Sequence, residues 1–211
     1  MNENVKKRLM RTAILCLVAL FIGAGLGAMQ IQREMNKTAP KEKPMAGVKI
    51  GGPFALLDQD GKMVTNAAFI GKYKLIYFGF TSCPAICPTE LAKMSKALNE
   101  LGAQGDVIQP IFITVDPERD TPKVMKDYIS LFHPRLIGLT GAKSEIDQTL
   151  KNYRIYAAKQ PEEGGGYTMN HSNYIYFMSP DDELLSIYHE DDSAEFIAQE
   201  LRLKAVPLPP S

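Results

Sequence analysis

Two of the chain's three cysteines, Cys83 and Cys87, lie in the stretch YFGFTSCPAICPTEL, where an apolar strand pattern gives way to a helical one. A strand-to-helix turn places both sulfurs beside the N-terminus of the helix, where unpaired backbone N–H groups and the helix dipole stabilise thiolate. Thiolate is the form that binds metals or exchanges disulfides. The third cysteine, Cys16, lies in an apolar N-terminal run, so Cys83 and Cys87 have only each other as partners. The sequence therefore predicts that the function resides at this turn.

The spacing Cys-x-x-x-Cys permits two kinds of chemistry. On one helical turn the two side chains share a face, close enough to form a disulfide or to clasp one metal. Two thiolates are soft ligands that suit copper(I) strongly and zinc well. A structural zinc site needs four ligands, whereas two sulfurs and one imidazole make a three-coordinate site that suits copper(I) and also accommodates copper(II). A purely structural disulfide is the simpler alternative, although so short a loop would gain little stability from one.

Three histidines are available to supply an imidazole. His133, in LFHPRL, has the pattern of a helix C-cap or a packed surface residue, and His189, in IYHEDD, that of a solvated residue at a strand end. His171, in TMNHSNYIYF, follows residues 160–169, whose three consecutive glycines predict a mobile loop that leads into a strand. Position alone does not choose among the three.

Strands alternate with helices along the rest of the chain. The hydrophobic periods predict a hairpin around Asp60 and Gly61, with further strands at 74–80, 107–115, 136–139, 174–178 and 184–188. They predict helices at 88–101, from an N-cap at Thr121, at 143–156, and at 192–203, where Asp192 and Glu195 resemble a capping box. Such alternation indicates an α/β sheet covered on both faces, and a cysteine-bearing turn after a central strand is typical of the thioredoxin-like variant.

The N-terminal part differs from the rest. Residues 12–29 carry no charge, are almost wholly apolar, and follow four basic residues, which predicts a transmembrane anchor with a cytoplasmic N-terminus at 1–11. A cleaved signal peptide is the alternative, but the run is long for one and lacks a clear A-x-A site. We expect a polar linker at 30–50, a globular domain at 51–205 and a flexible tail at 206–211. The formal net charge of zero provides no argument for nucleic-acid binding.

Four motifs, TSCPAICPTEL, VDPERDTP, FHPRLIGLTG and HSNYIYFMSPDDELL, resemble in their order the Sco/SenC family of copper proteins. The resemblance implies a thioredoxin-like fold with a central mixed sheet flanked by helices. It also implies one copper ion, as Cu(I) or Cu(II), held by Cys83, Cys87 and His171. Asp116 corresponds to an acidic residue near the family's site and is expected to act as a second-shell group. Members often carry Asp where this chain has Ala85 and Asn170, so negative charge is lost near the metal without loss of a ligand.

The resemblance further implies a role. We expect a membrane-anchored copper chaperone, not an enzyme, that supports assembly of the binuclear copper centre of cytochrome c oxidase. Its expected partner is subunit II or another copper-receiving oxidase subunit, with a periplasmic copper donor or thiol reductase as further partners. The expected place is the inner (cytoplasmic) membrane, as a single-pass protein with its soluble domain on the periplasmic face. The alternative is a thiol–disulfide oxidoreductase that keeps a partner's cysteines reduced, in which Cys83 and Cys87 form a redox-active disulfide.

Overall fold

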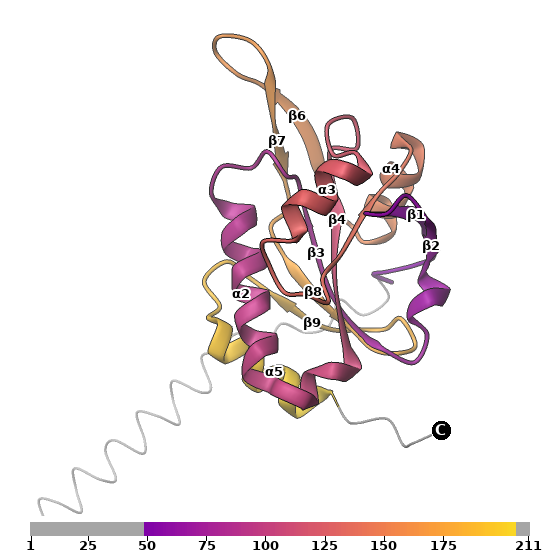
Figure 1. Ribbon diagram of the computed structural model, residues 1–211, viewed down its shortest axis with the longest axis vertical. Coiled ribbons are helices and arrows are strands. Elements are labelled where there is room, and N and C mark those ends of the chain that lie inside the picture. Colours follow the sequence, from indigo (N-terminus) through magenta and orange to yellow (C-terminus); the bar gives the residue numbers. More distant parts are fainter. Residues whose placement is uncertain (1–48, 206–211) are drawn as a thin grey trace, which may run out of the picture. The chain divides into compact units, whose positions relative to one another are not determined.

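The computed structural model describes residues 49–205 (Figure 1). The predicted cytoplasmic segment, the anchor at 12–29, most of the linker and the tail lie outside these residues. Within residues 49–205, no helix has the length and apolar character needed to cross a membrane.

A seven-stranded mixed sheet forms the centre of the domain, in the order β2-β1-β5-β4-β3-β8-β9. Strands β3, β4 and β5 are parallel, and the strands outside this trio run antiparallel to their neighbours. The strands span Ala55–Asp58 (β1), Met63–Thr65 (β2), Tyr73–Gly79 (β3), Ile108–Thr114 (β4), Ile137–Thr140 (β5), Ile175–Met178 (β8) and Leu184–Tyr188 (β9). Every residue of β3, β4 and β8 is buried, as expected for central strands covered on both faces.

Helices cover both faces of this sheet, which confirms the predicted central mixed sheet flanked by helices. The α-helices span Ile86–Leu101 (α2), Pro122–Ile129 (α3), Lys143–Asn152 (α4) and Ala194–Lys204 (α5), and short 3-10 helices span Asn66–Phe69 (η1) and Gly102–Val107 (η2). Helices α2 and α5 pack side by side (Figure 1). The predicted Thr121 cap is confirmed, because its side chain accepts a hydrogen bond from the Val124 N–H and Pro122 opens α3.

Alternating aromatic residues of β3 divide the core between the two faces. The Tyr77 ring stacks on Phe112 of β4, which contacts Tyr128 of α3, so this face lies under α3. Phe78 points the other way and contacts Tyr153, which follows α4, and Tyr176 of β8. The period of two in β3 therefore assigns each of its side chains to one helical layer.

Three local predictions were wrong. Residues 160–169 are not simply a loop, because β6 (Ala157–Pro161) and β7 (Tyr167–His171) pair antiparallel as a separate two-stranded sheet, and only its tip, with left-handed Gly164, Gly165 and Gly166, is a turn. Helix α4 ends at Asn152 and not at 156. The cap of α5 is Ser193, whose side chain accepts from the Phe196 N–H, instead of Asp192.

Candidate metal centre

The cysteine turn joins the end of β3 to the start of α2. The Cys83 N–H donates to the Phe80 carbonyl (3.3 Å), and the Cys87 N–H donates to the Cys83 sulfur (3.3 Å). Because Cys87 lies in the first turn of α2, the Cys83 sulfur satisfies one of the free N–H groups of the helix terminus. The predicted placement of both cysteines at a helix N-terminus is thus confirmed, although the helix begins at Ile86, two residues earlier than expected.

The two cysteines have different environments. Both are free thiols, Cys83 half-buried and Cys87 fully buried. Burial raises the pKa of the Cys87 thiol to about 12, although contacts with the Tyr77 hydroxyl and the Phe80 backbone favour its thiolate. At Cys87, burial therefore opposes the thiolate that the helix terminus is expected to favour. A soft cation would have to displace this proton on binding.

His171 meets the cysteine turn from the end of β7, 84 positions along the chain from Cys87. Its Nε2 atom lies 3.6 Å from the Cys87 sulfur. Its Nδ1–H donates to the Ser172 carbonyl (2.8 Å), which leaves the Nε2 lone pair directed at the sulfur. The edges of the Phe80 and Tyr77 rings hold the imidazole at centroid distances of 5.7 Å and 6.5 Å. Burial lowers the His171 pKa, so the ring is kept in the neutral form that binds metals.

The other two histidines lie elsewhere in the fold. His133 is almost fully buried after α3, and its Nδ1 accepts the Arg135 N–H (3.2 Å), which confirms the prediction of a packed residue. His189 is half-buried at the end of β9, where its ring meets the Tyr174 ring edge-on at 5.1 Å, so it is less solvated than expected. His171 is thus the histidine that the described structure brings to the cysteine pair.

An open hollow of about 280 Å³ lies over the site. Cys83 and His171 line it, and so do Ala85 and Asn170, the two positions where the family resemblance leads us to expect Asp. Within residues 49–205, no three His, Cys, Asp or Glu side chains form a preassembled metal cage. The donor set fits a soft cation all the same, because the Cys87 sulfur lies 3.6 Å from His171 Nε2 and the Cys83 sulfur lies 3.3 Å from the Cys87 backbone nitrogen.

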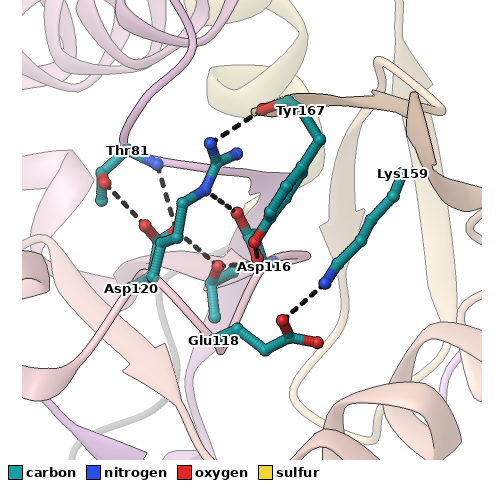
Figure 2. Close-up of polar contacts among 8 residues, drawn as sticks. Thr81, Asp116, Glu118, Asp120, Lys159 and Tyr167 are labelled. Carbon is teal, nitrogen blue, oxygen red and sulfur yellow. Dashed lines mark hydrogen bonds and ion pairs between the residues drawn. The ribbon is translucent and has the colours of Figure 1, made fainter. Parts of the chain in front are cut away.

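The segment after β4 carries two aspartates, Asp116 and Asp120, whose polar contacts Figure 2 shows. Asp116 is buried, accepts the Tyr167 hydroxyl (2.9 Å), and pairs with the Arg119 Nε–H. Its carboxylate is therefore engaged with groups other than Cys83, Cys87 and His171. Asp120 is also fully buried, and it accepts hydrogen bonds from Thr81 and Thr114. Sequence reasoning missed Asp120, for which the available signal was a second aspartate directly before the Thr121 cap.

Comparison with known proteins identifies the family of the chain. The family model for SCO1/SenC matches residues 42–205. "Protein SCO1 homolog 1, mitochondrial" of Arabidopsis thaliana is 44% identical over 79% of this chain, and the match spans about half of that relative (52%). ScoI of Bradyrhizobium japonicum, solved with copper bound, is 46% identical over 73% of this chain and 98% of its own, with a TM-score of 0.68.

A further solved structure is BsSco, a member of the Sco family of cytochrome c oxidase assembly proteins in which a disulfide switch was identified. It is 30% identical over 72% of this chain and 91% of its own, with a TM-score of 0.59. The likeness to these structures supports the predicted thioredoxin-like form of the α/β fold. With the matched family model and the shared architecture, the chain belongs to the SCO1/SenC family.

Proposed function

We propose that the chain binds one copper ion through Cys83, Cys87 and His171. The observation that carries the proposal is the 3.6 Å contact between the Cys87 sulfur and a His171 Nε2 whose partner nitrogen is already hydrogen-bonded. A ligating histidine commonly donates its other N–H to a carbonyl, which fixes its tautomer and orientation. Two sulfurs and one neutral imidazole suit copper(I), and the imidazole favours copper(II) as well.

The two cysteines have different roles in the proposed binding and transfer of the ion. Cys87 is fully buried against the core, so its sulfur holds a fixed position, whereas the half-buried Cys83 borders the open hollow. Cys83 is thus the sulfur that an incoming donor or a receiving thiolate reaches first. Direct exchange of ligands at this sulfur moves the ion between proteins without releasing it to water.

The role we propose is that of a copper chaperone, and not an enzyme, for the binuclear copper centre of cytochrome c oxidase. Support comes from the family membership and from the copper-bound ScoI structure. The apolar run at 12–29 and the basic residues before it support a single-pass anchor in the inner membrane, with the domain on its outer face. Anchoring in the membrane of the receiving oxidase subunit raises the effective concentration of a weak encounter.

Copper titration of the soluble domain, residues 45–211, tests the ligand set. We expect one ion per chain, and loss of both oxidation states in Cys83→Ala and Cys87→Ala. His171→Ala should weaken copper(II) more than copper(I), because two thiolates alone hold copper(I). His189→Ala serves as the control, since its ring contacts Tyr174 and not the cysteines. An unchanged copper(II) spectrum in His171→Ala would remove this residue from the site.

A thiol–disulfide oxidoreductase is the second candidate function. The favouring observation is that Cys83 and Cys87 are free, one helical turn apart, and that Cys83 is accessible. A disulfide-reduction assay with an insulin-type substrate separates the two functions. Turnover by the domain, unaffected in His171→Ala, would favour the oxidoreductase, and copper binding without turnover would favour the chaperone.

A further inference from the structure

One short segment, residues 116–120, touches both halves of the proposed site. It follows β4 and leads into α3, and it contains two buried aspartates, Asp116 and Asp120. The cysteines belong to the turn after β3, whereas His171 belongs to the β6–β7 sheet, which is not hydrogen-bonded into the seven-stranded sheet. The short connection 172–174 joins β7 to β8, which pairs with β3, and the 116–120 segment adds side-chain contacts to each half that help to set the distance between them.

Asp120 holds the cysteine half. One of its carboxylate oxygens accepts the Thr81 hydroxyl (2.6 Å), and the other accepts the Thr81 N–H (3.0 Å) and the Thr114 hydroxyl (2.6 Å). Its own carbonyl accepts the Thr140 hydroxyl (2.6 Å). Thr81 lies two residues before Cys83, so a buried carboxylate with three donors joins the start of the cysteine turn to β4 and β5. Hydrogen bonds to a charged, buried group are among the stronger ones in a protein.

Asp116 and Arg119 hold the histidine half (Figure 2). The Arg119 guanidinium donates from Nε to Asp116 and from Nη1 to the Tyr167 carbonyl (2.8 Å), and it lies 4.0 Å from the centre of the Tyr167 ring. The Tyr167 hydroxyl closes the triangle by donating to Asp116. Tyr167 begins β7 and His171 ends it, so this triangle holds the strand that presents the imidazole. Arg119 also lies 5.9 Å from the centre of the Phe80 ring, whose edge contacts His171.

We propose that the 116–120 segment is a positioning clasp, in which Asp120 places the cysteine turn and the Asp116–Arg119–Tyr167 triangle places the His171 strand. Neither aspartate acts as a ligand. The clasp sets the separation of the thiolates and the imidazole, and thereby the preference of the site between copper(II), which uses the imidazole, and copper(I), which the thiolates hold. This inference rests on the proposed copper site, and the experiment keeps the two separable.

The test compares matched variants of the soluble domain on both sides of the clasp. Arg119→Lys removes the fork that joins Asp116 to Tyr167, and Tyr167→Phe removes only the hydroxyl and keeps the ring. Thr81→Val removes one bond to Asp120 at nearly unchanged volume. Asp60→Asn is the control, because Asp60 lies in the turn between β1 and β2, outside the segment, and forms an exposed pair with Lys126 (2.7 Å). Thermal melting of each variant checks that it is folded.

Two readouts are needed, one of which does not involve metal. In the metal-free domain, the NMR signals of the His171 ring should shift or broaden in Arg119→Lys and Tyr167→Phe, and stay in place in Asp60→Asn. With metal, both histidine-side variants should lose roughly tenfold in copper(II) affinity, the lower end of the range for outer-shell partners, with copper(I) affinity changed by less than about twofold. Thr81→Val should weaken both oxidation states, because it loosens the thiolates.

The outcomes separate the clasp from the copper site. Copper binding in the unaltered domain, with every variant equal to Asp60→Asn in both readouts, would overturn the clasp and leave the ligands in place. If the unaltered domain binds no copper, the proposed site fails, and the metal-free His171 signals decide the clasp alone: displaced signals in Arg119→Lys support it, and unchanged signals overturn it.

Discussion

Adding one methyl group at Gly79, on the strand against which Cys87 packs, should displace the Cys87 sulfur in the proposed site. Gly79 ends β3, and a Cβ atom there would lie 2.9 Å from the Cys87 sulfur and 3.0 Å from ring carbons of both Tyr77 and Phe112. Ordinary contacts between such atoms are about 3.5–4.0 Å, so something must move by roughly 0.5–1 Å. All three neighbours are fully buried, and both rings are stacked on each other, so the sulfur has no free space to enter.

We therefore expect Gly79→Ala to cost about 1–3 kcal/mol of stability, the usual range for overpacking a core. For a domain of this size that corresponds to a fall in melting temperature of about 2–12 °C. Displacing the Cys87 sulfur also alters its 3.6 Å approach to His171 Nε2, so copper(II) affinity should fall together with stability. Calorimetry of the metal-free domain and copper(II) absorption spectra measure the two effects.

Gly138→Ala is the matched control. Gly138 of β5 pairs with Phe112, so its added Cβ would point to the same face of the sheet. That Cβ would meet the flexible end of Met125 at 3.1 Å and Ile129 at 3.2 Å, and neither cysteine is among its neighbours. It should cost less stability and leave the copper spectrum unchanged. If Gly79→Ala melts at the original temperature and binds copper with the original spectrum, the close packing of Cys87 on β3 is not what positions this ligand.

Three further predictions concern the thiols, the pH response and the anchor. The metal-free domain should form a reversible Cys83–Cys87 disulfide, and copper(I) should bind only to the dithiol; thiol counting with and without reductant checks this, and thiols that stay free after prolonged mild oxidation would contradict it. Burial lowers the pKa of both His133 and His171 from 6.5, so as the pH falls these histidines are protonated in the unfolded chain before they are protonated in the folded one. Their contribution to the free energy of unfolding should therefore be complete above about pH 6.5 and decrease as the pH drops toward the folded-state pKa values. Denaturation midpoints across this range measure the effect, and a flat profile would refute it. Exporting the domain without residues 1–30 should lower oxidase assembly, with partial rescue by added copper, and normal assembly in cells that lack the whole protein under scarce copper would argue against the chaperone.

Most strands and helices were predictable because their side chains face a core. β3, β4 and β8 are predominantly apolar, and α3 carries a Thr-Pro start, so hydrophobic pattern and capping chemistry located them. The β6–β7 pair was missed for the opposite reason. Its residues are mostly exposed or half-buried and polar, and three glycines interrupt them, so the segment has the composition of a loop although its backbone is paired.

The site was only partly accessible to sequence reasoning. The spacing of Cys83 and Cys87 indicated metal or redox chemistry. His171 lies 84 positions from Cys87 and was chosen by family resemblance, because hydrophobic periodicity does not predict which distant residues come into contact. The burial of Cys87, which raises its pKa, depends on packing against Gly79 that no local pattern encodes. Asp120 escaped notice because a charged residue between prolines has the composition of a solvated loop.

The register of the β6–β7 hairpin has a consequence for how this face of the molecule can vary. Ala157 pairs with His171 at one end of the ladder, and Pro161 pairs with Tyr167 beside the glycine tip. The position of the His171 ring thus depends on two ladder pairs, Ala157 with His171 and Pro161 with Tyr167. Residues added or removed among the glycines of the tip change neither pair. The length of the tip can therefore change without altering the ladder. The same property makes this turn a natural insertion point for a reporter peptide that must not disturb the ligands.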